Sequence, residues 1–223
     1  MVTMQTYPEA IFFDVDGVLI DSLAIKGNAF SRAFSDFPDA HDEIVSFHFA
    51  HGGVNRREKI AALHHMIVGR APSERELADR ITSFAVAVVQ GVVAAPEIPG
   101  AGAAVAEWSK KSTLYAVSAT PTDELLTIFD RRDLTQYFRC VLGWPPHKEL
   151  IIKEILDANG YIPSSCILVG DSFEDLQAAI GAGVMFIQVC PPGSTRFNES
   201  GEAIDDLREL SNAIDAVMKN PHG

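Results

Sequence analysis

Two aspartates separated by one residue follow a short apolar run near the start of the chain. The run, residues 10–13, has the length and bounding of a buried strand, and Asp14, Asp16 and Gly17 come after it. Carboxylates are rarely left without a partner where an apolar strand ends. A turn after Asp14 would bring Asp16 back beside it, and two such carboxylates coexist when they share a cation or a proton. The pair therefore indicates a chemical site, whereas the plainer alternative is a solvated turn.

A second group of carboxylates follows another apolar run late in the chain. Residues 167–169 are apolar, and Asp171 and Asp175 stand after them at the start of a predicted helix. Because they are four residues apart, the two carboxylates can face the same point. Oxygen ligands of this kind favour Mg²⁺, which keeps several waters and accepts a substrate phosphate as a ligand. Acidic side chains that merely favour a helix N-terminus would explain one carboxylate better than a cluster.

A hydroxyl-rich segment ends a third apolar run. Residues 114–117 are predicted to form a strand, and Ser118, Ala119 and Thr120 follow it before a predicted helix. Hydroxyl groups and backbone N–H groups at such a junction can hold an oxyanion. Either Ser118 or Thr120 could instead cap the helix, so this segment by itself is a weak indication of a site.

One lysine stands where a helix is predicted to start. A cation is unfavourable there against the helix dipole, so Lys148 needs a neighbouring negative group to explain its position. Lys153 is the rival candidate, but it lies more than one turn into the helix and is expected to face solvent. We therefore expect Lys148 to be the cation of the site.

The order of these segments resembles the motifs of the haloacid dehalogenase-like hydrolases, in the helical-cap branch that contains phosphoglycolate phosphatases and β-phosphoglucomutases. The resemblance covers nearly the whole chain. It rests on Asp-x-Asp-Gly-Val-Leu-x-Asp-Ser at 14–22 and on Gly-Asp-x-x-x-Asp at 170–175, in the order typical of the family.

This resemblance implies a role for each of the chemical residues. Asp14 would be the nucleophile that takes the phosphoryl group, and Asp16 the general acid and base. Ser118, with Ala119 and Thr120 beside it, would bind the phosphoryl group, and Lys148 would neutralise its charge. The cofactor would be Mg²⁺, with Asp14, Asp171 and the backbone carbonyl of Asp16 as its ligands, and Asp175 would support this site either as a further ligand or through those residues.

A loop before residue 58 is the predicted substrate-binding element outside the motifs. Residues 51–57 join a pair of glycines to clustered cations. Capped relatives commonly carry Gly-x-Ser-Arg here and contact the substrate with this loop, so the resemblance implies that Gly53, Asn55 and Arg56 bind substrate. Asn55 stands where serine is usual. The alternative is an exposed basic turn in which Arg56 pairs weakly with Glu58.

The elements that position these residues follow from the hydrophobic periodicity. Strands and helices alternate from residue 97 onward, which predicts an α/β fold with a doubly wound, Rossmann-like parallel sheet. Between residues 22 and 96 the periodicity is helical, with Ser22 placed to cap the first helix. We therefore expect a core domain of residues 1–21 and 97–223 and a second, smaller all-helical cap domain of residues 22–96. The predicted strands are 10–13, 114–117, 139–142, 167–169 and 184–189, and a last helix is predicted to carry Ile204, Leu207, Ile214 and Val217.

Composition limits the classes of partner. A net charge of −12 argues against nucleic acid and anionic membranes, and 47% hydrophobic residues are ample for a core. The longest apolar-rich window, residues 84–95, is too short to span a bilayer, and the N-terminus resembles no signal peptide. The three scattered cysteines are expected to be free thiols. We expect a cytoplasmic protein that is a monomer or a weak homodimer.

These observations predict a Mg²⁺-dependent phosphatase that hydrolyses a small phosphorylated metabolite through an aspartyl phosphate. A sugar phosphomutase of the β-phosphoglucomutase type has the same chemical groups, so the motifs do not separate it from a phosphatase. A dehalogenase is disfavoured because that branch lacks the second aspartate and the metal. A binding protein without catalytic activity is the third alternative, and the complete set of motifs argues against it.

Overall fold

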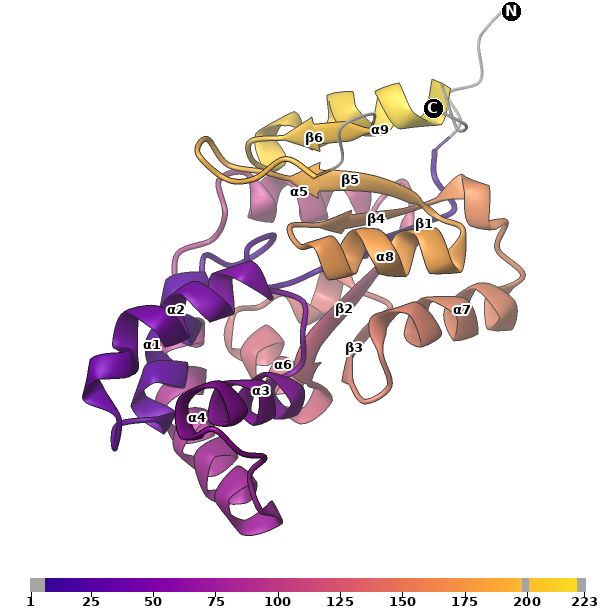
Figure 1. The fold of residues 1–223 in the computed structure, drawn as a ribbon. Coiled ribbons are helices and arrows are strands. Elements are labelled where there is room, and N and C mark those ends of the chain that lie inside the picture. The colour runs from indigo at the N-terminus through magenta and orange to yellow at the C-terminus, as the bar shows by residue number, and fades with distance from the viewer. Residues whose placement is uncertain (1–6, 198–200, 220–223) are drawn as a thin grey trace, which may run out of the picture.

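The apolar run of residues 10–13 forms a central strand of a parallel sheet. The computed structural model describes residues 7–197 and 201–219, and within them the strand order of the six-stranded sheet is β3-β2-β1-β4-β5-β6 (Figure 1). The strands are β1 Ala10–Phe13, β2 Thr113–Pro121, β3 Cys140–Trp144, β4 Cys166–Gly170, β5 Met185–Val189 and β6 Glu202–Ile204. The predicted α/β fold with a doubly wound parallel sheet is confirmed.

Alternating side chains of β1 divide the core between the two faces of this sheet. Ile11 and Phe13 lie in one buried cluster, and Phe12 lies in the other. The first cluster also takes in the helices α5, α6 and α9, whereas α7 and α8 cover the opposite face. Their bounds are α5 Ala101–Trp108, α6 Thr122–Arg131, α7 Lys148–Asn159, α8 Phe173–Ala182 and α9 Leu210–Lys219.

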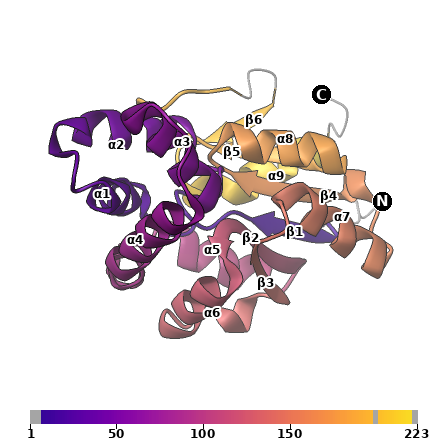
Figure 2. The same cartoon turned by 60° about the horizontal axis from the view of Figure 1, so that its bottom comes forward.

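Four helices connect β1 to α5, and we call them the cap helices: α1 Leu23–Ala33, α2 His41–Ala50, α3 Arg56–Val68 and α4 Glu74–Ala94. They gather beyond the carboxyl ends of the strands in both views (Figures 1 and 2). Phe30 of α1 and Phe84 of α4 have ring centroids 4.3 Å apart, so these helices share a core of their own. We propose that the cap helices form the separate domain expected from the sequence.

The two passages of the chain between core and cap helices run side by side. The backbone N–H of Asp21 donates to the carbonyl of Pro96 at 2.9 Å, and the N–H of Ile98 donates to the carbonyl of Leu19 at 3.1 Å. These bonds lie next to the predicted boundaries at 21–22 and 96–97. Such a paired connection can act as a hinge while keeping its backbone groups bonded.

Two local predictions for the chain's elements were wrong. Ile204 belongs to the short strand β6 and Leu207 to a 3₁₀ turn, Leu207–Glu209, so the last helix starts only at Leu210. Three residues are too few to show the period of a strand. Ser22 precedes α1 but its hydroxyl makes no capping bond, because it donates to Asp16 instead.

Helix α4 extends beyond the apolar window of residues 84–95, which by itself is too short to span a bilayer. Ser73 and Glu76 form a capping box at its N-terminus, and the helix runs for 21 residues from Glu74. By length and composition α4 could cross a membrane. Phe84 and Val88 of this helix are buried in the core, however. Core helices of soluble proteins can have the same length and apolar composition, so these two properties are weak evidence for a membrane span.

Candidate active site

The turn after β1 sets the first aspartate against the neighbouring strand. The backbone N–H of Asp14 donates to the carbonyl of Val169 in β4 at 2.9 Å. Gly17 has a φ of 81°, and a Cβ on it would lie 2.2 Å from Oδ2 of Asp171. Glycine is therefore needed both for the backbone conformation and for the close approach of Asp171.

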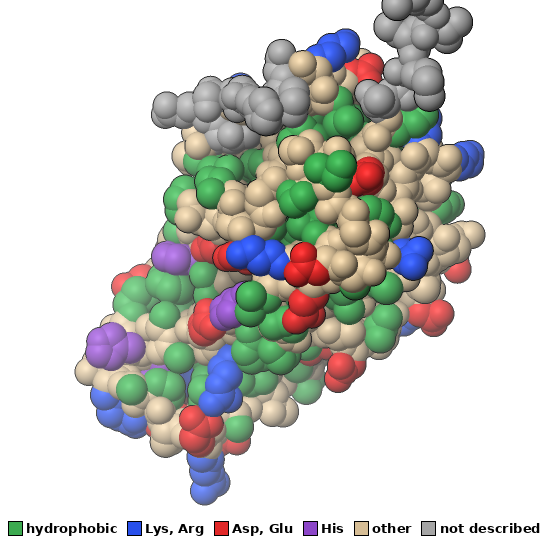
Figure 3. Space-filling view, turned by 90° about the vertical axis from the view of Figure 1, so that its right-hand side faces the viewer, with side chains coloured by type: hydrophobic (Ala, Val, Ile, Leu, Met, Phe, Trp, Pro, Cys, Tyr) green, Lys and Arg blue, Asp and Glu red, His purple; other side chains and the backbone are tan. Residues whose placement is uncertain are grey.

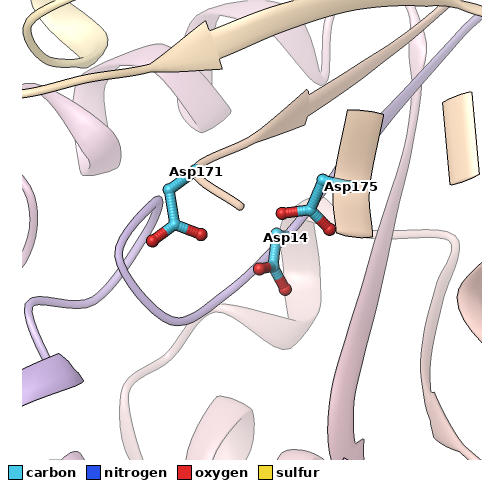
Figure 4. A group of neighbouring side chains, drawn as sticks. All are labelled: Asp14, Asp171 and Asp175. Atoms are coloured by element: carbon cyan, nitrogen blue, oxygen red, sulfur yellow. The ribbon is translucent and has the colours of Figure 1, made fainter. Parts of the chain in front are cut away.

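Three carboxylates from two distant segments converge at this turn. Asp14, Asp171 and Asp175 each offer an oxygen, and these oxygens all lie within 4.8 Å of one another (Figure 4). The carboxylate of Asp175 is held in its orientation by Ser172 at the start of α8, whose N–H and hydroxyl both donate hydrogen bonds to Oδ2 of Asp175. We call these three residues the carboxylate cluster.

Lys148 supplies a cation to the cluster. Its Nζ lies 3.1 Å from Oδ1 of Asp14 and donates a hydrogen bond to Oδ1 of Asp175. Burial alone would lower the pKa of Lys148, but the two carboxylates outweigh it and raise the pKa above its usual value. This pairing explains a lysine at the start of α7. Lys153 pairs with Glu149 on the exposed side of the helix.

The carboxylate cluster carries more negative charge than one ammonium offsets. Burial raises the pKa of Asp14 to about 7, with Asp175 and Asp16 adding to the effect and Lys148 opposing it. Burial likewise raises the pKa of Asp171 well above its ordinary value, and the charges of Asp14 and Asp175 add to it. A divalent cation among these oxygens would relieve the repulsion, so the donor set fits Mg²⁺.

Asp16 lies in a separate hydrogen-bonded environment. Its Oδ2 accepts from Lys26 at 2.5 Å and from Thr120 at 3.2 Å, and its Oδ1 accepts from Ser22 at 2.6 Å. Burial alone would raise the pKa of Asp16, but the charge and hydrogen bond of Lys26, with those hydroxyls, hold it below its usual value. The carboxylate of Asp16 is thus engaged away from the cluster, and the predicted role of its backbone carbonyl in metal binding stays a prediction.

The last residues of β2 contact Asp16. The strand extends to Pro121 and so contains Ser118, Ala119 and Thr120, whereas the sequence predicts that they follow it. The hydroxyl of Ser118 is buried, accepts from the N–H of Thr120 at 3.1 Å and lies 3.5 Å from Oδ2 of Asp16. Helix α6 starts at Thr122 without a side-chain cap, so the helix-cap alternative for Ser118 and Thr120 is excluded. Ala119 lines the same cavity as these hydroxyls.

The loop before α3 contacts the core at two points. A Cβ on Gly53 would lie 2.6 Å from both Cβ of Glu174 and Oγ of Ser172, so glycine allows the loop to approach α8. Arg56 donates two hydrogen bonds to Glu124 of α6, at 2.7 and 2.5 Å. The alternative pairing with Glu58 is therefore wrong. The side chain of Asn55 caps α3 by accepting from the N–H of Glu58.

Sequence reasoning missed three polar residues of the cap helices. Lys59 and His48 are each 2% exposed, and the side chain of Lys26 is 12% exposed. Both lysines lie one helical turn before an apolar residue of the buried face, Phe30 in α1 and Leu63 in α3. A lysine in the apolar stripe of a predicted helix was the signal that could have found them.

These residues enclose a narrow cavity between the cap helices and the sheet. It has a volume of about 30 Å³, and its lining includes Asp14, Asp16, Ser118, Ala119 and Thr120 from the core and Lys26, His48, Gly53, Arg56 and Lys59 from the cap helices. A larger cavity of about 660 Å³ includes Asp171 in its lining but not Asp14. The narrow cavity is therefore the one in which a ligand meets the first aspartate.

The arrangement has counterparts among known proteins. Residues 8–183 match the model of the haloacid dehalogenase-like hydrolases. The chain is 28% identical to phosphoglycolate phosphatase of Pseudomonas putida over 92% of its own length and 79% of that protein. It is 25% identical to hexitol phosphatase A of Escherichia coli over 96% of both chains.

Solved structures show the same fold. A haloacid dehalogenase-like family hydrolase of Streptococcus pneumoniae superposes with a TM-score of 0.71 at 20% identity, over 94% of this chain and 99% of that one. CbbY of Rhodobacter sphaeroides, in complex with phosphate, superposes with a TM-score of 0.72 at 21% identity, over 93% and 99% of the two chains. At these identities the likeness concerns the fold alone.

Proposed function

The chain belongs to the haloacid dehalogenase-like hydrolases, and from this premise we propose that it is a Mg²⁺-dependent phosphatase of a small phosphomonoester, acting through an aspartyl phosphate. One observation carries the proposal. The Asp14 carboxylate, at the carboxyl end of a central strand, lies in a cavity with a buried lysine on one side and a hydrogen-bonded second aspartate on the other. These are the groups that in-line phosphoryl transfer to a carboxylate requires.

The proposed reaction has two steps. In the first, an oxygen of Asp14 attacks phosphorus, the bond to the leaving oxygen breaks, and Asp16 gives that oxygen a proton. In the second, Asp16 takes a proton from water, whose oxygen attacks phosphorus and frees Asp14 and inorganic phosphate. Lys148 offsets the charge of the acyl phosphate, and Ser118 with the neighbouring backbone N–H groups binds its oxygens.

The pairing of Asp16 with Lys26 suits the second step better than the first. Asp16 is held ionised, which is the form that accepts a proton from water. The first step needs its protonated form. We therefore infer that Lys26 withdraws from Asp16 when substrate enters and returns for hydrolysis of the acyl phosphate.

Mg²⁺ would be held by the carboxylate cluster, with the backbone carbonyl of Asp16 as the further ligand. When bound, it would supply positive charge to the phosphoryl oxygens. The support for it is the set of three neighbouring carboxylates of Asp14, Asp171 and Asp175 against the single ammonium of Lys148.

Hydrolysis is favoured over the phosphomutase alternative because the curated relatives described above are both named as phosphatases. Their names differ in the substrate's tail, which is a carboxylic acid in one and a polyol in the other. The residues proposed for phosphoryl transfer do not distinguish between the two tails.

The test is release of phosphate from a generic aryl phosphate with Mg²⁺, with excess chelator, and after Mg²⁺ is added back. Asp14→Asn should lower turnover by at least 100-fold, about 3 kcal/mol, because an amide cannot form the acyl phosphate. Asp79→Asn, an exposed change on α4, is the matched control. Full activity in chelator would reject the metal, and retained turnover in Asp14→Asn would reject the nucleophile.

A further inference from the structure

Lys59 is a buried cation that has no anionic partner among the residues that the structure describes. Its side chain is 2% exposed, and its Nζ contacts Nδ1 of His48 at 3.0 Å and the carbonyl of Gly52 at 3.4 Å. Within residues 7–197 and 201–219, no carboxylate oxygen lies within 4.0 Å of this ammonium. Burying a charge without a partner costs roughly several kcal/mol of folding free energy. A negatively charged group of a ligand beside Lys59 would offset this cost.

In its contact with His48, the ammonium of Lys59 is the hydrogen-bond donor and the imidazole is the acceptor. Nε2 of His48 lies 3.1 Å from the carbonyl of Leu23, so this nitrogen carries the proton and donates. Nδ1 then accepts from the ammonium of Lys59 and cannot offset its charge. Burial lowers the pKa of His48 to about 3, and the charge of Lys59 adds to the effect, which agrees with a neutral ring. With two of its N–H groups used, Lys59 has a third N–H group left for a ligand.

The free donor belongs to the cavity that holds the nucleophile. Lys59 and Asp14 line the same narrow space, whose apolar walls include Phe30 and Phe84. Arg56 lines it too, and its buried Nε has no hydrogen-bond partner among the described residues, although its other nitrogens bind Glu124. Two unused cationic donors thus lie on the cap side of a space of about 30 Å³.

We propose that Lys59, with Nε of Arg56, binds a carboxylate at the non-reacting end of the substrate, and that the substrate is a short phosphorylated hydroxy acid rather than a phosphorylated polyol. The inference rests on the proposed function for the phosphoryl end at Asp14. The carboxylate of such an acid gives the buried ammonium the counter-charge that the described residues do not provide. A hydroxyl in its place would leave the ammonium unpaired, which disfavours polyols strongly.

The test compares two substrates that differ only at this end, 2-phosphoglycolate and 2-hydroxyethyl phosphate. The wild type should prefer the acid by at least 30-fold in kcat/KM, and Lys59→Met should reduce the preference to within three-fold, mainly through KM. Arg57→Met, which removes an exposed cation from the same helix, should keep the preference. Equal losses on both substrates, or no loss on either, would overturn the assignment.

Two further measurements separate this proposal from misfolding and from failure of the phosphatase proposal. Thermal unfolding of Lys59→Met should occur at the wild-type temperature or above, because an unpaired buried charge is removed. Calorimetric binding to the Asp14→Asn protein should show the same preference for 2-phosphoglycolate and its loss with Lys59→Met. If an aryl phosphate is hydrolysed but the acid is neither preferred nor bound more tightly, the carboxylate site is wrong and the phosphatase stands. If nothing is hydrolysed, the binding preference alone decides the carboxylate site.

Discussion

Asp14 and Asp16 are separated by one residue and have different electrostatic environments. Burial raises the pKa of Asp14 to about 7, and the charge of Asp175 adds to the effect, while Lys148, which Asp14 shares with Asp175, opposes it. Asp16 has Lys26 and hydroxyl donors, and its pKa falls below the usual value although burial opposes this. Pairs of carboxyl groups whose environments separate their pKa values commonly divide acid and base chemistry between them.

The role of Asp16 as acid and base predicts a dependence on the leaving group. Asp16→Asn should slow hydrolysis of an alkyl phosphate by at least ten-fold more than that of a nitrophenyl phosphate, because an alkoxide needs the proton and a nitrophenolate barely does. Burst kinetics with the nitrophenyl ester should show accumulated acyl phosphate, since the base of the second step is also lost. Asp21→Asn, an exposed neighbour, is the control. Equal losses on both esters would argue against the acid role.

At the scale of elements, helix α3 joins the cap helices to the core. Its first residue, Arg56, holds Glu124 at the start of α6 with two hydrogen bonds and also lies over the Phe84 ring, 4.5 Å from its centroid. The preceding loop approaches α8 closely at Gly53. The position of α3 therefore determines where Arg56 and Lys59 lie relative to Asp14.

The contribution of Arg56 to substrate binding is a separate prediction. Arg56→Ala should lower kcat/KM for the true metabolite by ten-fold or more, about 1.4 kcal/mol, and spare a small aryl phosphate, because the tail of the metabolite loses a donor. Arg57→Ala is the matched control on the same helix. Glu124→Gln removes the ion pair but keeps the guanidinium, so its effect on activity measures only the contribution of the contact between α3 and α6. If Arg56→Ala and Glu124→Gln impair both substrates alike, Arg56 only fastens the helices.

The chain carries a net charge of −12, yet three cations line the cavity that contains Asp14 and Asp16. On the face in Figure 3, acidic, basic and hydrophobic side chains are interspersed. The cavity instead gathers Lys26, Arg56 and Lys59 where a doubly charged small anion would enter. The cytoplasmic location and the monomeric or weakly dimeric state stay predictions.

Lys59 should make the stability of the whole protein depend on pH. Burial lowers its pKa to about 7, with Lys26 adding to the effect, while an unfolded lysine titrates near 10.4, so the unfolded state binds more protons between these values. Stability contributed by this group is therefore lowest at and below about pH 7 and rises with pH toward 10. The charged groups acting on it besides Lys26 are Asp16, Asp171 and Glu174, and the neutral ring of His48 is in contact.

Urea unfolding of wild type and Lys59→Met at pH 7 and pH 9.5 measures this effect. The variant should be the more stable at pH 7, and the wild type should recover about 3 kcal/mol relative to it by pH 9.5. Arg57→Met should show no such change in the difference. A difference that does not vary with pH would mean that Lys59 is not a buried charge in solution.

The fold class and the strand ends that bring the candidate site residues together could be predicted from the sequence. Alternation of strands and helices is a local pattern, and β1, β2 and β4 formed where apolar runs end in Asp14, Ser118 and Asp171. The carboxyl ends of parallel strands meet at one edge, so their convergence follows from the fold class. The sequence did not predict β6, because a three-residue edge strand has too few residues to show a period and forms through its backbone pairing with β5.

The tertiary structure alone decided how charges are shared within the site. Nothing local to Asp16 indicates that Lys26 binds it, or that Arg56 selects Glu124, 68 residues away, over Glu58. Sequence spacing fixes which side chains share a helix face, but the partner on another element depends on how the elements pack. The buried ammonium of Lys59, which has no carboxylate partner among the described residues, is the clearest case, because a lysine on a helix is ordinary in a sequence and only the packing of the elements removes it from water.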